Sequence, residues 1–290
     1  MKTQLIGLIA ETSIHPGSGQ DTGFIDLPVA RESFTDYPVI VGSSFKGALR
    51  ERARYNDWEP YKKNDDDGRW ETDDGKKKPK TKADKIFGRG DGIGSLIVSD
   101  IRLIALPIRS LTGTYKWVTC PHLVERFVRD AKRAGIVEKL PKLTLGKTEY
   151  LGEDNGSLFL EERQFESIGS LDKNIIAMVK KLIPHDETKG RVKEQLVMIH
   201  DDDFAWFARY GLAVTARNVL DNVTKASKNL WYEETIPPDA IFYSLLGDRQ
   251  NSNALDQVKS LFEGNAYIQV GANETVGQGW LAINWLEGGK

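Results

Sequence analysis

A histidine and an aspartate lie in one segment that has the composition of a loop. Residues 15–28 contain three glycines and two prolines, which disfavour both helix and strand. The segment follows a short apolar run, and loops that leave rigid strands often carry catalytic groups. His15 and Asp26 are therefore candidates for acid–base chemistry. The residues alone leave a structural alternative open, in which His15 caps a turn and Asp26 forms a turn hydrogen bond.

A second motif, residues 42–50, has the character of a phosphate-binding helix start. Apolar residues 39–41 lead into a Gly-Ser turn and then into a predicted helix, which Ser43 and Ser44 can cap. Helix N-termini offer unpaired N–H groups to anions. A cation in the first turn opposes the helix dipole unless an anion binds there. The candidate phosphate-binding residues are Gly42, Ser43, Ser44, Lys46 and Arg50. An ordinary amphipathic surface helix is the alternative, and P-loop spacing is absent.

Aromatic residues and adjacent carboxylates are combined at residues 231–238. Glu233 and Glu234 follow a Trp-Tyr pair and precede a Pro-Pro pair. Cations upstream, Arg217 among them, add positive charge. An edge strand that ends at the prolines is one interpretation. A carboxylate and an aromatic that face nucleic acid are the other.

The glycines of residues 271–280 form the last motif. Gly271, Gly277 and Gly279 lie between two strand-like runs, where glycine allows close approach of the backbone to a ligand. These three glycines are thus candidate contacts to a bound ligand. The spacing does not match a dinucleotide-binding fingerprint, and a plain glycine-rich hairpin is the alternative.

The elements that must position these motifs alternate irregularly, which predicts an α+β fold rather than a regular βαβ array. Predicted strands are 4–12, 96–106, 115–119, 157–160, 196–199, 212–216, 241–246, 266–270 and 280–285. Predicted helices are 44–56, 122–134, 173–182, 202–210 and 253–262. The first strand is continuously apolar, which is typical of a buried strand.

Two regions differ from this pattern. Residues 57–85 contain no Ile, Leu, Val or Met and carry runs of like charge, so we expect an exposed, mobile insertion. Its aromatic residues leave open a role as an arm that reaches RNA or a neighbouring subunit. Residues 139–191 mix Gly, Pro and charges with short apolar runs, which indicates an insertion or lid on the core.

Composition excludes several classes of protein. The chain has 290 residues with 40% hydrophobic residues, enough for a sizeable core. The formal net charge of -2 excludes a globally basic nucleic-acid binder but allows a local basic face. The lone Cys120 excludes an internal disulfide and a CxxC zinc site, which favours a reducing, cytoplasmic setting. The first apolar run is too short for a signal peptide, and no membrane span is expected.

The segment 15–28 contains two separate motifs, and with the other three it gives five motifs that, taken in order, resemble a known family. They are residues 15–19, 23–28, 42–50, 231–238 and 271–280. Their sequence and separations are similar to the RAMP superfamily and, within it, to the repeating backbone subunit of the Cmr complex, a type III-B CRISPR effector. The resemblance spans nearly the whole chain. Residues 57–85 are its least family-like part.

The resemblance implies a fold and a set of partners. A single domain over residues 1–290 would have a modified ferredoxin-like, RRM-related core with insertions described as palm, fingers and thumb. Copies would stack along a CRISPR RNA together with other Cmr subunits. A thumb hairpin would enter the guide–target duplex, and each copy would cut the bound target RNA with a divalent metal ion, Mg²⁺ or Mn²⁺. No membrane partner is implied.

The resemblance also implies site residues. The family's catalytic aspartate matches Asp26, which is also a potential metal ligand, and a histidine of the same loop matches His15. A carboxylate before the prolines matches Glu233 or Glu234. A basic residue that holds guide phosphates matches Lys46. The family often has a tyrosine after the carboxylates, but this chain has a threonine there, so no tyrosine role is carried over.

Three alternatives stay open at this stage. The related type III-A backbone subunit would share fold and chemistry but differ in partners. A RAMP endonuclease that matures guide RNA would act alone and without metal. A non-catalytic RNA-binding scaffold would use Asp26 only structurally. A small-molecule enzyme is disfavoured because no cofactor fingerprint is present.

Overall fold

Strands and helices mix along the chain as predicted. The computed structural model describes residues 1–19, 23–56, 58, 81–89, 92–136, 140–141, 143–249 and 251–286. The strands are β1 (Lys2–Ala10), β2 (Val39–Ile40), β3 (Leu96–Val98), β4 (Ile101–Arg109), β5 (Tyr115–Thr119), β6 (Glu149–Leu151), β7 (Ser157–Leu160), β8 (Arg163–Gly169), β9 (Leu196–Ile199), β10 (Ala213–Leu220), β11 (Ser227–Thr235), β12 (Ile241–Asp248), β13 (Tyr267–Gln269) and β14 (Trp280–Trp285). The helices are α1 (Gly42–Tyr55), α2 (Lys82–Phe87), α3 (Pro121–Arg133), α4 (Lys173–Leu182), α5 (Asp186–Gln195), α6 (Asp201–Tyr210), α7 (Ala254–Ser260) and the 3₁₀ turn η1 (Glu274–Val276).

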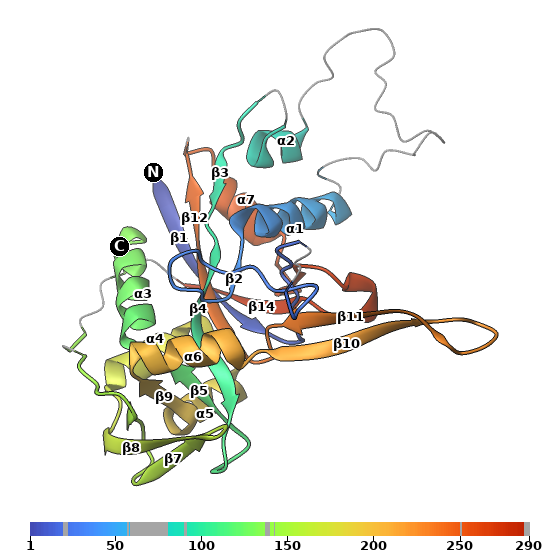
Figure 1. Ribbon diagram of the computed structural model, residues 1–290. Helices are drawn as coiled ribbons and strands as arrows, with labels where there is room; N and C mark the ends of the chain where they lie inside the picture. Colours follow the sequence, from blue (N-terminus) through green and yellow to red (C-terminus); the bar gives the residue numbers. More distant parts are fainter. Residues whose placement is uncertain are drawn as a thin grey trace, which may run out of the picture.

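One extended sheet connects most of the strands (Figure 1). In the described part of the chain its order is β13-β14-β1-β12-β4-β5-β9-β6-β8-β7, with β2 paired to β4 and β3 paired to β12. Most neighbours are antiparallel, while β5–β9 and β6–β8 are parallel. This mixture confirms the α+β prediction and excludes a regular βαβ array.

Strand β1 is buried on both faces, which explains its continuous apolar sequence. Ile6 and Leu8 belong to one core cluster, whereas Leu5 and Ile9 belong to another. Side chains alternate across a strand, so the two sets face opposite sides of the sheet. At Gly7, a Cβ atom would lie 2.2 Å from the carbonyl oxygen of Leu182 at the end of α4, so only glycine fits.

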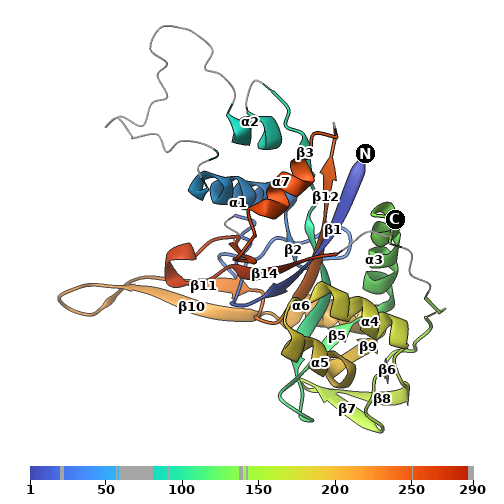
Figure 2. The ribbon, with the colours of Figure 1, turned by 180° about the vertical axis from the view of Figure 1, so that it is seen from behind.

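Helices cover both faces of the sheet. Apolar residues of α1, α6 and α7 pack into the first cluster, and those of α4 and α5 pack into the second. Figure 1 shows α6 in front of the sheet. Figure 2, seen from behind, shows α4 and α5 on the opposite side. None of the helices in the described part of the chain is both long and apolar enough to cross a membrane.

Strands β10 and β11 form a separate two-stranded hairpin that extends away from the body (Figure 1). Most β10 residues and the first half of β11 are exposed, whereas Glu233, Glu234 and Thr235 at the hairpin base are buried. The predicted edge strand at 231–238 is therefore the returning arm of this hairpin. Its base is the part that joins the site described below.

Several local predictions need correction. The predicted strand 96–106 is interrupted at Ser99 and Asp100, which separate β3 from β4 although both strands pair with β12. The helices α2 and α5 and the short strands β6 and β8 carry few signals in the sequence and were not expected. Residues 57 and 59–80 of the charged insertion lie outside the described residues. Its end is ordered, since α2 packs beside α1 and buries Asp84.

Residues 139–191 contribute to the main sheet. Strand β6 pairs with β9, and β8 connects β6 to β7. Buried side chains of α4 enter the second core cluster. The predicted insertion is thus continuous with the core, and whether it acts as a lid stays a prediction.

Candidate functional site

A cleft of about 590 Å³ gathers residues from all five sequence motifs. It is lined by His15, Pro16, Gly17, Gly19, Leu27, Ser44, Gly47, Ala48, Glu51, Glu233, Gln269, Val270, Gly271, Ala272 and Asn273. These residues come from the loop after β1, from α1, from the base of β11, and from the end of β13 with the segment that follows it. Segments distant in sequence thus meet at the foot of the hairpin.

The two adjacent glutamates face opposite sides of β11. Glu233 lines the cleft, and its Oε1 accepts hydrogen bonds from Asn273 Nδ2 and from Arg217 Nη2, the latter at 3.3 Å. Glu234 instead accepts from Arg31 Nη2 at 2.6 Å and from the N–H of Val29 at 3.0 Å. Both carboxylates are almost fully buried. Of the two candidates, Glu233 is the one that reaches the cleft.

His15 is held in one orientation by the backbone of β11. Its Nδ1 lies 2.7 Å from the carbonyl oxygen of Glu234, and the ring is buried. A carbonyl oxygen only accepts, so Nδ1 carries the proton and donates it. The other ring nitrogen, Nε2, lies on the side of Gly17, where a Cβ atom would come within 3.0 Å of it. His15 and Gly17 both line the cleft.

Asp26 lies beside the cleft and bonds to the hairpin. Its Oδ2 accepts from the N–H of Tyr232 at 2.7 Å. The following residue, Leu27, lines the cleft and pairs with Glu233 in a parallel bridge. Asp26 is partly exposed, and its Oδ1 has no hydrogen-bond partner among the described residues. The carboxylate therefore keeps one oxygen for a ligand.

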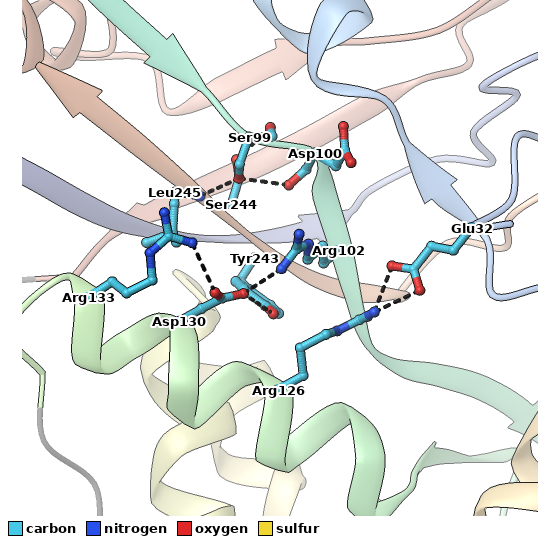
Figure 3. A network of polar contacts seen from close by, with 10 residues as sticks. All are labelled: Glu32, Ser99, Asp100, Arg102, Arg126, Asp130, Arg133, Tyr243, Ser244 and Leu245. Atoms are coloured by element: carbon cyan, nitrogen blue, oxygen red, sulfur yellow. Dashed lines mark hydrogen bonds and ion pairs between the residues drawn. The ribbon is translucent and has the colours of Figure 1, made fainter. Parts of the chain in front are cut away.

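The segment after Asp26 is fastened by two ion pairs. Arg31 joins Glu234 and also donates to the carbonyl oxygens of Asp36 and Ala208. Both carboxylate oxygens of Glu32 accept hydrogen bonds from Nη1 of Arg126 in α3, each at 2.7 Å (Figure 3). In the same view, Asp130 of α3 is bonded to the sheet. Because α3 is anchored to the sheet, the loop that follows Asp26 is anchored as well.

The start of α1 differs in part from prediction. The helix begins at Gly42 with Val41 as N-cap, and no side chain caps it. The prediction that Ser43 and Ser44 cap the helix is wrong, because both lie inside its first turn and are exposed. The N–H of Gly42 donates to Asp100 Oδ1 at 2.7 Å. One N-terminal donor is thus already satisfied by a carboxylate, which also suits the helix dipole.

The two candidate phosphate-binding cations of α1, Lys46 and Arg50, have different surroundings. Lys46 is half-buried, and burial, followed by the charge of Arg50, lowers its pKa. Arg50 donates to Asp84 Oδ1 at 2.9 Å and to the carbonyl oxygen of Gly88 at 2.7 Å. These bonds tie α1 to α2 and give Arg50 a structural task. A role of either cation in binding RNA stays a prediction.

The three glycines of the last motif have separate local roles. Gly271 has a φ of 96°, lines the cleft, and has no room for a Cβ atom against the carbonyl oxygen of His15. Gly279, at 87°, lies against the carbonyl oxygen of Val270. Gly277 ends η1 at 81° in open space. Only Gly271 belongs to the cleft; contacts of these glycines with RNA stay a prediction.

Sequence reasoning missed three partners of the site. Arg217 was counted as a general cation, although it contacts Glu233. The sequence marks neither Asn273 nor Arg31 as a site residue. The signal for Arg217 is its place on β10, where Thr215 is the register partner of Glu233 and Arg217 follows on the same face. Nothing local in the sequence marks Asn273, which is 40 residues from its partner.

The described residues offer few ligands for a divalent metal ion. Among the described residues, no three His, Cys, Asp or Glu side chains gather as a metal site. Mg²⁺ commonly uses one or two carboxylates together with substrate phosphates. Oδ1 of Asp26, which has no partner in the part of the chain that the structure describes, fits that donor set, provided that RNA supplies further oxygens.

Comparison with known proteins places the chain in a family. Residues 8–282 match the model of the RAMP superfamily. The chain belongs to the RAMP superfamily. The RAMP resemblance of the five motifs is thereby confirmed. A relative from Pyrococcus furiosus, named CRISPR system Cmr endoribonuclease Cmr4, is 33% identical, and the match covers 99% of this RAMP chain and 97% of the relative.

Solved structures share this RAMP fold along the whole chain. The crystal structure of oligomeric Cmr4 from Pyrococcus furiosus has a TM-score of 0.73 and 27% identity, and the match covers 100% of both chains. A chain of the cryo-EM structure of the type III-B Cmr-beta complex bound to cognate target RNA has a TM-score of 0.72 and 20% identity. That match covers 98% of this chain and 97% of the other, and it shows the fold alone.

Proposed function

We propose that this RAMP protein is the repeating backbone subunit of a type III-B Cmr effector and that it cuts target RNA bound to the guide. The full-length match to a Cmr endoribonuclease supports the assignment. The oligomeric crystal form of a similar protein supports stacking of copies. CRISPR RNA, target RNA, further copies and other Cmr subunits would be its partners.

The finer description of the fold belongs to this proposal. The strands around β1 and β12 would be the ferredoxin-like palm, and residues inserted around α1 and α2 the fingers. The hairpin β10–β11 would be the thumb, because it is long, projects from the body and carries exposed apolar side chains such as Val219, Leu220 and Leu230. Such a projection can enter a nucleic-acid duplex without disturbing the core.

The observation that carries the proposed activity is the meeting of His15, Glu233 and the Asp26 loop at one cleft. RNA contains its own nucleophile, the 2′-hydroxyl beside the scissile phosphate. Cleavage requires that this hydroxyl be oriented, that its proton be removed, and that the leaving oxygen receive a proton. A carboxylate and an imidazole are suited to these two proton transfers.

Each side chain has a task that follows from its contacts. Asp26, whose Oδ1 has no partner within the described ranges, would accept the 2′-hydroxyl proton or bind a metal ion. His15, held at Nδ1 by the Glu234 carbonyl, would exchange a proton through Nε2. Glu233 would orient the RNA from the cleft wall. Lys46 would hold a guide phosphate.

The metal requirement is part of the same proposal. A divalent ion bound by Asp26 and RNA oxygens would stabilise the negative charge that develops on the phosphate. Removal of divalent ions with EDTA should therefore stop cleavage by the assembled complex. A guide-maturing RAMP endonuclease would behave differently, since it would cut repeat RNA alone and in EDTA.

Asp26→Asn tests the activity in the assembled complex loaded with guide RNA. Asparagine keeps an oxygen that accepts from Tyr232 N–H but lacks the carboxylate charge. We expect the target-cleavage rate to fall roughly 10²–10⁴-fold with target affinity unchanged. If the Asp26→Asn variant cut target RNA at the wild-type rate, the proposed role of Asp26 would be overturned. An inactive wild-type complex that binds target would indicate the scaffold alternative.

A further inference from the structure

The carboxylate of Glu233 is held by two side chains from different elements. Asn273, in the turn before η1, donates to Oε1, and Arg217 of β10 donates to the same atom. Asn273 is itself held, since its amide also donates to Gln278 Oε1 at 2.9 Å. The second oxygen of Glu233, Oε2, has no hydrogen-bond partner among the described residues. Glu233 is 3% exposed, so water reaches it poorly.

We propose that Arg217 and Asn273 are positioning residues for target cleavage, which fix Oε1 of Glu233 so that Oε2 faces the bound RNA. The inference rests on the proposed function and adds two residues to its site. A glutamate has three rotatable bonds, and a misplacement of about 1 Å at a reacting group can cost roughly 10²-fold in rate. Two donors on one oxygen remove this freedom before RNA arrives.

The position of Arg217 also couples the hairpin to the cleft. Arg217 lies opposite Trp231 in the β10–β11 register, two residues further out than Thr215, which lies opposite Glu233. Its Nε is buried and has no partner in the described structure. The guanidinium thus uses one N–H on Glu233 and keeps a second, buried donor beside it. A shift of the hairpin would change the hold on Glu233 directly.

The test uses the assembled, guide-loaded complex under single-turnover conditions with saturating target. Arg217→Met and Asn273→Ala should each lower the cleavage rate constant about 10- to 100-fold, with unchanged target Kd. Arg217→Lys should recover most of the rate, because lysine restores a charged donor. Asn273→Asp should be worse than Asn273→Ala, because it places a second carboxylate against Glu233.

A double-mutant cycle separates positioning from direct contact with RNA. If Arg217 acts through Glu233, then Arg217→Met has no further effect in the Glu233→Gln background. An additive loss with weaker target binding would instead mean that Arg217 contacts RNA, and it would overturn the inference. Lys193→Met is the matched control, since Lys193 lies on α5, outside the hairpin and the cleft lining, pairs with Glu153 and is exposed. Its cleavage rate should equal that of the wild type.

A purely structural role has its own signature. If Arg217 only stabilises the hairpin, Arg217→Met lowers the melting temperature while the assembled complex cleaves at the wild-type rate, which would refute positioning. Cleavage by the wild-type complex distinguishes a failure of the proposed function from a failure of this inference. Should it fail to cut target RNA, the proposed function falls. Should it cut while Arg217→Met and Asn273→Ala cut equally well, only this inference falls.

Discussion

Arg31 Nη2 lies 2.6 Å from Glu234 Oε1, and the pair joins the loop after Asp26 to the base of the hairpin. The side chains are 17% and 3% exposed, so the pair is largely removed from water. The same guanidinium binds two carbonyl oxygens, one of which belongs to Ala208 in α6. Three separate segments of the chain therefore depend on one arginine. This relationship positions the site without contributing a side chain to the cleft.

Arg31→Ala should destabilise the protein by about 3–5 kcal/mol, because it leaves the buried Glu234 carboxylate without its cation. Chemical denaturation measures this change in the free energy of unfolding. Adding Glu234→Gln should recover part of the loss, since the uncompensated charge is removed. Arg209→Ala is the matched control. Its pair with Asp36 is exposed, so we expect a cost of only about 0.2–1 kcal/mol.

Glu233→Gln and Glu234→Gln should have contrasting effects. Glu233 lines the cleft, so its replacement should lower the target-cleavage rate at least about tenfold with little loss of stability. Glu234 is committed to Arg31 and Val29, so its replacement should mainly lower the melting temperature. Cleavage assays and thermal unfolding on the same preparations distinguish the two. The reverse pattern would mean that Glu234 is the catalytic carboxylate.

Lys46→Ala should weaken guide RNA binding and reduce the slope of log affinity against log salt by about one, the value for one lost phosphate contact. Filter binding or fluorescence anisotropy over a salt series measures the slope. Lys46→Arg is the control that keeps the charge and should keep the slope. An unchanged slope in Lys46→Ala would show that Lys46 does not contact a phosphate.

The Arg50–Asp84 pair predicts a pH effect on stability. Burial acts to raise the pKa of the Asp84 carboxyl, but hydrogen bonds from Thr81 and Arg50 outweigh it and hold the pKa below its ordinary value of 3.8. The stability from Asp84 is therefore full above this ordinary value and is lost as pH falls through the lowered folded pKa. The difference in unfolding free energy between wild type and Asp84→Asn should be constant near neutral pH and shrink in acid. A pH-independent difference would contradict this assignment.

Arg50→Ala tests whether this arginine is structural. It removes the nearer of the two arginines that pair with buried Asp84, and a donor to Gly88, so α2 should loosen. Faster amide hydrogen exchange over Lys82–Phe87, with unchanged exchange in α3, is the expected result. If exchange in α2 is unchanged while guide binding falls, Arg50 acts mainly on RNA.

Local sequence determined the elements and the candidate motifs. The boundaries of β5, β7, β9, β14 and α4 agree with prediction, because each carries a clear apolar period between turn residues. The helix at α1 was expected from its Gly-Ser start, and Phe45 and Leu49 are buried together as their spacing indicates. Helix α2 was not predicted, because it follows a charged segment and its only sequence signal is the capping box of Thr81 and Asp84.

Tertiary structure alone decided how the motifs combine. The sequence presents Glu233 and Glu234 as equivalent neighbours, and only the pairing of β11 with β10 and Leu27 directs one into the cleft and the other to Arg31. Adjacent strand residues face opposite sides, so the choice depends on what each side packs against. Those partners lie tens to hundreds of positions away, at Asn273 and Arg31. No local pattern encodes such contacts, because they form only when the folded sheet brings the segments together.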